Sequence, residues 1–187
     1  DRWLGGDQFD AVMNYQLTRA CLEFFIDDLN RDLIQESSYG SIQSISADEF
    51  ARTLSDLLAW YPPDIAPAQM NLLDSHDTAR FVTIARGDVT ALKLALLTLF
   101  GYVGAPSIYY GDEIAMEGAQ DPDCRRAMIW EPSTGGRAMI EYVKRLTALR
   151  KKYAALRRGA MTNLYANGKA FAFARQLENE TVIVAVN

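Results

Sequence analysis

One short apolar run ends abruptly in polar residues that could take part in chemistry. The run Met70–Leu73 has the length of a buried strand, and Asp74-Ser75-His76-Asp77 follows it directly. The ends of buried strands are where barrel enzymes hold their catalytic side chains. Asp77 is therefore a candidate catalytic carboxylate. His76, the only histidine of the chain, is a candidate hydrogen-bond donor to the same ligand.

Both residues of this pair also have a purely structural interpretation. His76 could bond to backbone groups at the strand end, and from residue types alone this is the favoured reading. Asp77 could instead cap the N-terminus of a helix that begins near Thr78 and Arg80.

A polar stretch between Gly118 and Gly136 contains a second group of candidates. It includes Asp121-Pro122-Asp123-Cys124-Arg125-Arg126, and an irregular loop of this length inside a compact unit is usually functional. The stretch is therefore a candidate functional segment. The alternative for its charged residues is a salt bridge within the loop that contacts no ligand.

Apolar runs that alternate with helical patterns must position these residues. Strands are expected at Phe9–Tyr15, at the run before Asp74 and at Ser107–Tyr110. Helices are expected over residues 17–29, 46–58, 80–103 and 140–156, the second opened by the capping box Ser46-Ala47-Asp48-Glu49 and the last ended by Gly159. This order predicts parallel βα units, of which three are too few to close a barrel.

The period changes after Gly159. Asn167-Gly168 is a hairpin signal, Phe171 and Phe173 alternate with small residues, and residues 181–186 are mostly β-branched. These features predict the beginning of a separate antiparallel β module.

Composition limits the class of protein. The chain has 187 residues, of which 49% are apolar, so a sizeable core is expected. A net charge of −5 argues against nucleic acid as a partner, and no run reaches transmembrane length. Cys21 and Cys124 are flanked by unlike segments and are expected to be free thiols, which favours a cytoplasmic setting. Because the first residue is Asp, we expect a piece of a longer chain or a processed product.

Four motifs in order resemble those of a known family. Residues 72–78, Leu-Leu-Asp-Ser-His-Asp-Thr, are similar to the fourth conserved region of the α-amylase superfamily of retaining glycoside hydrolases. Residues 104–113 are similar to that family's eighth barrel strand and its following loop. The segments at 9–15 and 121–126 resemble, more narrowly, the neopullulanase, cyclomaltodextrinase and maltogenic amylase branch.

The resemblance implies a fold and its limits. Residues 1–158 would form the C-terminal portion, about strands 6–8, of an α/β (β/α)₈ TIM barrel. Residues 159–187 would begin the antiparallel β-sandwich domain that follows the barrel. The family's nucleophile and general acid lie on the fourth and fifth strands, so neither is expected in this sequence.

The resemblance also implies roles for single residues. Asp77 matches the family's third catalytic carboxylate, and His76 matches its neighbour, which binds the same sugar. Asp121 and Arg125 match a pair that grips a glucose unit. Tyr15, at a strand's C-terminal end, could stack on a sugar face or simply pack.

Other carboxylates and tyrosines are expected to be structural. Asp112 and Glu113, as sequence neighbours, should point in opposite directions and belong to loop structure. Tyr109 and Tyr110 are expected in the barrel core.

The implied activity is that of an α-glucan hydrolase. The parent would cleave cyclodextrins, pullulan or maltooligosaccharides, with possible transglycosylation, whereas this chain alone should be inactive. The alternative is a non-catalytic half-barrel that acts as a partial sugar-binding or assembly module. Exposed sheet edges should be covered by self-association or by the missing barrel half. No cofactor is implied; calcium occurs in parts of the family, but no ligand cluster is visible in this sequence, and neither nucleic acid nor membrane is an expected partner.

Overall fold

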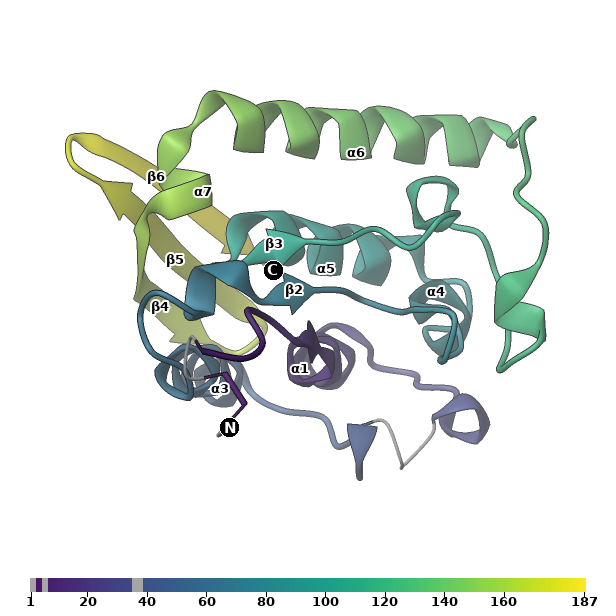
Figure 1. Ribbon diagram of the computed structural model, residues 1–187. Coiled ribbons are helices and arrows are strands. Elements are labelled where there is room, and N and C mark those ends of the chain that lie inside the picture. The colour runs from purple at the N-terminus through teal and green to yellow at the C-terminus, as the bar shows by residue number, and fades with distance from the viewer. Residues whose placement is uncertain (1–2, 5–6, 35–38) are drawn as a thin grey trace.

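A parallel sheet of three very short strands lies at the centre of the molecule. The computed structural model describes residues 3–4, 7–34 and 39–187. The strands are β1 (Met13–Asn14), β2 (Met70–Asn71) and β3 (Ala105–Pro106), in the order β1-β2-β3. Both pairs are parallel, with Met13 opposite Met70 and Met70 opposite Ala105. The loops that follow the three strands therefore leave the sheet at one edge (Figure 1).

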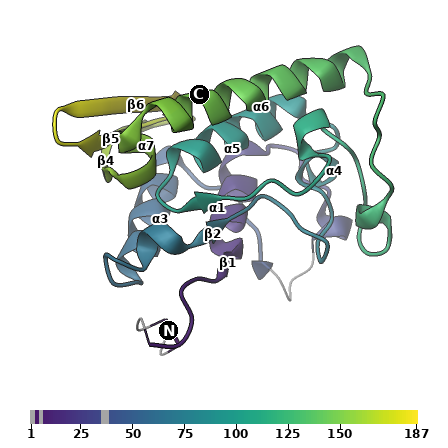
Figure 2. The same cartoon turned by 45° about the horizontal axis from the view of Figure 1, so that its top comes forward.

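Helices connect these strands, as the sequence pattern predicts. Between β1 and β2 lie α1 (Tyr15–Phe25) and α3 (Ala47–Ala59), and between β2 and β3 lie α4 (Phe81–Ile84) and α5 (Val89–Gly101). After β3 come α6 (Thr134–Lys152) and α7 (Ala154–Arg158). Helix α5 lies behind the sheet in Figure 1, and α6 runs along α5 in both ribbon views (Figure 2). Four 3₁₀ turns are η1 (Arg31–Leu33), η2 (Ala66–Ala68), η3 (Asp112–Ile114) and η4 (Asp123–Arg125).

The predicted capping box opens α3. The Ser46 hydroxyl accepts a hydrogen bond from the Glu49 amide at 3.2 Å, and the Glu49 carboxylate accepts one from the Ser46 amide at 2.8 Å. Apolar positions at helical spacing then bury Phe50, Leu54 and Leu57. The sequence thus fixes both the start and the buried face of this helix.

Several boundaries differ from the prediction. The strand expected at Phe9–Tyr15 is only Met13–Asn14, because the Asn14 side chain caps α1 by accepting a hydrogen bond from the Leu17 amide and Tyr15 already begins that helix. The helix expected over 140–156 is divided at Tyr153, whose extended backbone separates α6 from α7.

The helix expected over 80–103 is broken between α4 and α5, because Arg86 and Gly87 have positive φ values of 51° and 85° that a helix cannot contain. The third strand pairs at Ala105–Pro106, just before the expected Ser107–Tyr110, because its register is set by hydrogen bonds to β2.

The expected β module is a three-stranded antiparallel meander. Strands β4 (Ala160–Asn167), β5 (Ala170–Leu177) and β6 (Glu180–Val186) pair in sequence order, and the first turn falls at the predicted Gly168. Four aromatic rings connect it to the helices: Phe24 stacks on Phe50 at 4.4 Å, Phe50 meets Phe171 at 5.4 Å, and Phe171 stacks on Phe173 at 5.5 Å. The antiparallel sheet therefore shares one core with helices α1 and α3.

A buried arginine strengthens this connection. Arg175 on β5 is fully buried, and its guanidinium donates to the carbonyls of Gly101 at 2.5 Å, Leu156 at 3.0 Å and Gly159 at 2.8 Å. These carbonyls lie at the C-terminal ends of α5 and α7, where helix carbonyls lack partners within the helix. The side chain thus satisfies two helix ends from the neighbouring sheet.

Among the described residues, no helix combines the length and the apolar character that crossing a membrane requires.

Candidate functional site

The His76–Asp77 turn lies in the loop that follows β2, at the edge of the sheet where the strands end. The preceding Asp74 and Ser75 are buried, whereas the side chains of His76 and Asp77 are 53% and 56% exposed. His76 Nε2 lies 3.2 Å from Asp77 Oδ1. Asp77 does not cap the next helix: the Asp74 carboxylate accepts the Phe81 amide at 2.7 Å instead. The carboxylate of Asp77 therefore does not act as a helix cap.

The loop after β3 brings Asp121 and Arg125 to the same turn. Arg125 Nε lies 2.8 Å from Asp121 Oδ1, and Arg125 Nη2 lies 3.6 Å from Asp77 Oδ1. Arg125 Nε also donates to the His76 carbonyl at 3.0 Å, and the Cys124 thiol donates to it at 3.3 Å. The structure thus joins two motifs that are more than 40 residues apart in sequence.

Tyr15 reaches the turn from the end of β1. Its hydroxyl lies 2.8 Å from Ser75 Oγ, which also accepts the Asp77 amide at 3.0 Å. Its ring packs edge-on against Tyr39, with 6.1 Å between the ring centroids. The half-buried Tyr15 is therefore tied to the turn by its hydroxyl and partly covered by a second aromatic ring.

All five predicted residues consequently lie on one surface at the ends of the parallel strands. Two carboxylates, one guanidinium and one imidazole face solvent there and offer both acceptors and donors, a combination suited to a ligand rich in hydroxyl groups.

Sequence reasoning missed Ser75, which accepts a hydrogen bond from the Asp77 amide, and Cys124, which donates one to the His76 carbonyl. The only available signal was that each adjoins a predicted site residue.

The carboxylates after β3 behave as expected from their spacing. Asp112 is buried and faces Arg80, whereas Glu113 points away and accepts the Gly111 amide at 2.7 Å. Tyr110 differs from the expectation of a core residue: it is 36% exposed, and its hydroxyl donates to the Arg126 carbonyl at 2.7 Å. Tyr109 is also only half-buried, and both rings lie against the Arg80 guanidinium and not in the apolar core.

The surface around the turn is open. A hollow of about 440 Å³ lies beside η3 and the following loop, but none of the five predicted residues lines it. Within the described ranges, no three His, Cys, Asp or Glu side chains are grouped so that they could hold a metal ion.

Comparisons with known proteins agree with this geometry. Residues 1–144 match the family model described as the alpha amylase catalytic domain. The chain is 44% identical to a cyclomaltodextrinase of Geobacillus thermopakistaniensis and 41% identical to neopullulanase 2 of Thermoactinomyces vulgaris; each match covers 99% of this chain and 29% of the relative. The chain therefore spans less than a third of the length of these relatives.

A solved structure shows the same fold. The debranching enzyme of Nostoc punctiforme superposes on the whole chain with a TM-score of 0.94 and 40% identity, and the match covers 38% of that enzyme. The relatives are glycoside hydrolases with a TIM-barrel fold, and this chain is a partial α/β portion of it. With its motifs, its parallel βα units and these relatives in agreement, the chain belongs to the alpha-amylase family.

Proposed function

We propose that this chain forms part of the substrate-binding surface of a retaining hydrolase that acts on α-glucans. One observation carries the proposal: His76, Asp77, Asp121 and Arg125 converge at the ends of the parallel strands, although they come from two separate loops. The names of the relatives point to cyclodextrins, pullulan or maltooligosaccharides as substrates.

In this proposal Asp77 is a catalytic residue that touches the sugar, but it is neither nucleophile nor acid. Retaining glycosidases use two other carboxyl groups for bond cleavage, about 5–5.5 Å apart. Asp77 would accept hydrogen bonds from ring hydroxyls that strengthen as the ring distorts toward the transition state. His76 would donate to the same sugar.

Asp121 and Arg125 would hold a neighbouring glucose unit. The 2.8 Å ion pair between them fixes the carboxylate and the guanidinium side by side, so that hydroxyl groups could bind both. Tyr15 would border this surface, and its bond to Ser75 suggests that it also supports the turn.

The portion of the barrel and the domain limits are part of the proposal. Residues 1–158 would supply about the sixth to eighth strands with their helices, and residues 159–187 would begin the β-sandwich domain. The change from parallel to antiparallel pairing at Ala160 supports that limit.

This chain alone should be inactive, because neither of the two bond-cleaving carboxyl groups has a counterpart in its motifs. The same covalent intermediate could be captured by a sugar hydroxyl, so transglycosylation is a close variant. The two free, buried cysteines support a cytoplasmic setting.

The test needs the complete enzyme. We expect the reading frame upstream of Asp1 to encode a Glu-x-Trp shortly before it and an Arg-x-Asp further back. In that enzyme, Asp77→Asn should lower kcat on a cyclodextrin by about 100-fold or more, since hydrogen bonds of this kind contribute several kcal/mol and a tenfold change in rate corresponds to about 1.4 kcal/mol.

Asp48→Asn is the matched control, because Asp48 is exposed on α3 and forms an ion pair with Arg52. An unchanged kcat in Asp77→Asn would exclude the catalytic role.

A non-catalytic sugar-binding or assembly module is the second candidate, favoured by the open, exposed setting of the turn. Calorimetric titration of the purified 187-residue chain with maltooligosaccharides, alongside an assay of cyclodextrin turnover, separates the two. Binding without turnover, together with an upstream frame that lacks both motifs, would favour the module. Clear turnover by this chain would overturn the prediction that it is inactive.

A further inference from the structure

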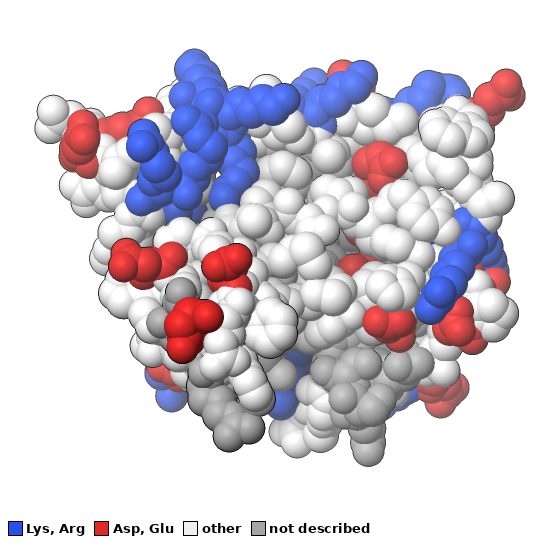
Figure 3. Space-filling view, viewed as in Figure 1, with Lys and Arg blue, Asp and Glu red and all other residues white. Residues whose placement is uncertain are grey.

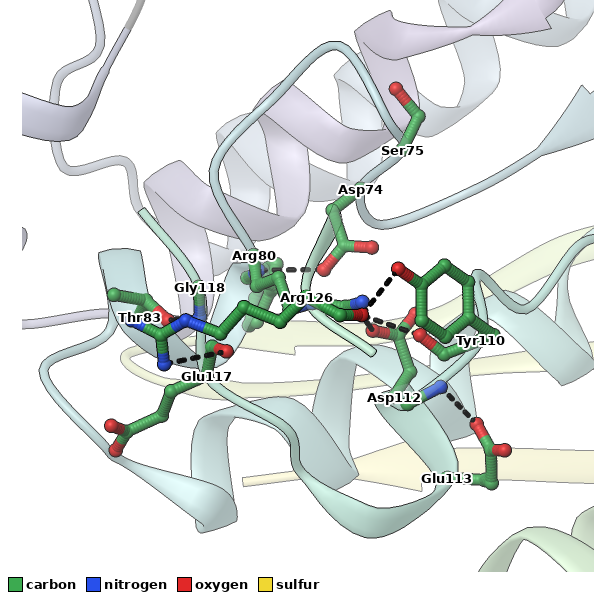
Figure 4. A network of polar contacts seen from close by, with 12 residues as sticks. Asp74, Ser75, Arg80, Thr83, Tyr110, Asp112, Glu113, Glu117, Gly118 and Arg126 are labelled. Atoms are coloured by element: carbon green, nitrogen blue, oxygen red, sulfur yellow. Dashed lines mark hydrogen bonds and ion pairs between the residues drawn. The ribbon is translucent and has the colours of Figure 1, made fainter. Parts of the chain in front are cut away.

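Three charged side chains are buried together beneath the His76–Asp77 turn. Asp74, Arg80 and Asp112 are only 2%, 0% and 4% exposed. Arg80 Nη1 donates to the Tyr110 carbonyl at 2.6 Å and lies 3.4 Å from Asp112 Oδ1. Figure 4 shows the side chains of the cluster converging from the loops after β2 and β3.

This cluster is incompletely satisfied by hydrogen bonds. Within the part of the chain that the structure describes, Arg80 Nε and Nη2 and Asp74 Oδ1 have no hydrogen-bond partner. The guanidinium lies instead over the rings of Tyr109 and Tyr110, 4.5 Å and 4.9 Å from their centroids. Apolar side chains of similar volume often stabilise a protein as well as a buried ion pair does. Stability alone is therefore a weak reason for such a cluster, and a fixed geometry is a better one.

The balance of charge favours a single retained proton. Burial raises the pKa of Asp74 to about 6. The pKa of Asp112 is raised well above its ordinary value, by burial first and then by the negative charge of Asp74, which together outweigh the effect of Arg80. A proton on Asp112 leaves one carboxylate and one guanidinium, so the buried cluster carries no net charge.

Hydrogen bonds connect the cluster to both halves of the site. The Arg80 amide donates to the Gly118 carbonyl at 2.9 Å, and the Gly118 amide donates to Thr83 Oγ1 at 2.8 Å. On the other side, the Tyr110 hydroxyl donates to the carbonyl of Arg126, the neighbour of Arg125. Arg80 lies three residues after Asp77. The cluster is thus a short path from one binding loop to the other.

We propose that Arg80 and Asp112 are positioning residues that fix the His76–Asp77 turn against the Asp121–Arg126 segment. They act through backbone and through Tyr110, and neither touches the proposed substrate. The inference deepens the proposed function, because it assigns what aligns the two loops. Its test needs no turnover, so a negative result would leave the proposed function standing.

The single histidine supplies a site-specific probe. The ring carbon–proton signal of His76 can be assigned without ambiguity in NMR spectra of the full 187-residue chain, because there is no other histidine. Asp112→Ala should shift or split this signal by more than its linewidth, since the turn loses its fixed support. Asp112→Asn keeps the shape and hydrogen-bonding capacity of the neutral carboxyl and should leave the signal in place.

Asp88→Ala is the control for mere loss of stability. Asp88 caps α5 by accepting the amides of Thr90 and Ala91, and it takes no part in the cluster. This variant should melt at a lower temperature while the His76 signal stays unchanged. A wild-type signal in folded Asp112→Ala, or an equal shift in Asp88→Ala, would overturn the proposal.

Tyr110→Phe covers the case in which Asp112→Ala does not fold. It removes only the partly exposed hydroxyl that donates to Arg126. We expect the His76 signal to shift here as well, because Arg125 bonds to the His76 carbonyl. If the signal does not move, the cluster does not align the two loops.

Discussion

Arg125 connects the two loops of the proposed site. Its guanidinium meets the carboxylates of Asp121 and Asp77 and the carbonyl of His76. A planar guanidinium can serve several acceptors at fixed angles, whereas an ammonium cannot. The cation therefore orders both loops and would also face the substrate.

Replacing the Arg125 guanidinium by an ammonium group tests that interpretation. In the complete enzyme, Arg125→Lys should lower kcat/KM for maltooligosaccharides by about 10- to 100-fold, because a hydrogen bond to a charged group contributes about 1.5–3 kcal/mol. Steady-state kinetics of Arg52→Lys, a surface residue on α3, provide the comparison and should match the wild type. Wild-type kinetics in Arg125→Lys would show that the Arg125 guanidinium does not bind the substrate.

At the scale of elements, α3 is the clearest case of local sequence determining structure. Ser46→Ala should cost about 1 kcal/mol of unfolding free energy, since the first turn loses its N-cap. Urea unfolding followed by circular dichroism measures this cost. Ser44→Ala, exposed in the preceding loop, should have no effect, and equal stability of the two variants would contradict the capping role.

The pH dependence of this cap has a definite sign. Hydrogen bonds from Ser46 lower the pKa of Glu49 below its ordinary value. The stabilisation is therefore present at neutral pH and is lost as pH falls through that lowered pKa. The penalty of Ser46→Ala should shrink in acid.

Helix periods and caps predicted which elements exist, but not all of their limits. The capping box and the apolar spacing of α3 are local signals, so they could be read directly. The break at Arg86 could not, because nothing in its side chain demands a left-handed backbone. The register of β3 was also hidden, since hydrogen bonds to a strand more than 30 residues earlier determine it.

At the scale of the whole molecule, the convergence of the site residues could be predicted from the sequence, whereas the buried cluster beneath them could not. Parallel strands end at one edge, so motifs that follow them meet there whatever their separation in sequence. The pairing of Arg80 with Asp112 depends instead on how two loops fold back beneath that edge. From the sequence, Asp112 was indistinguishable from an ordinary loop carboxylate.

The retained proton of Asp112 makes stability depend on pH. Its raised pKa means that the folded state keeps a proton that the unfolded chain has released. This contribution to stability falls as pH rises from the ordinary carboxyl range toward the raised pKa. Asp112→Asn removes this titrating group. The unfolding free energy of the variant relative to wild type should therefore rise with pH, by about 1.4 kcal/mol for each pH unit between the unfolded and folded pKa values.

Urea unfolding at several values between about pH 4.5 and pH 8 measures this difference in unfolding free energy between Asp112→Asn and wild type. Asp48→Asn, which alters an exposed ion pair, should differ from wild type by the same unfolding free energy at every pH in this range. A difference in unfolding free energy that stays constant or narrows with rising pH would contradict the raised pKa of Asp112 in the folded state.

The sheet surface predicts association. Among the described residues, β1 and β3 each pair on one side only, and the middle of the face over β2 and β3 is largely uncharged (Figure 3). Unpaired strand edges favour pairing with another chain. Light scattering after size exclusion should show this 187-residue chain as a dimer or larger. A monodisperse monomer would contradict the expectation.

The hydrogen bonds of Arg175 to three carbonyls have a consequence for exchanging domains between enzymes. The seam between Gly159 and Ala160 looks like a natural crossover point for a chimaera. A crossover there would replace the strand that supplies Arg175 while leaving the carbonyls of Gly101 and Leu156 behind. A donor sequence without arginine in this register would leave two helix ends unsatisfied. In a chimaera, β5 should therefore come from the same parent enzyme as α5 and α7.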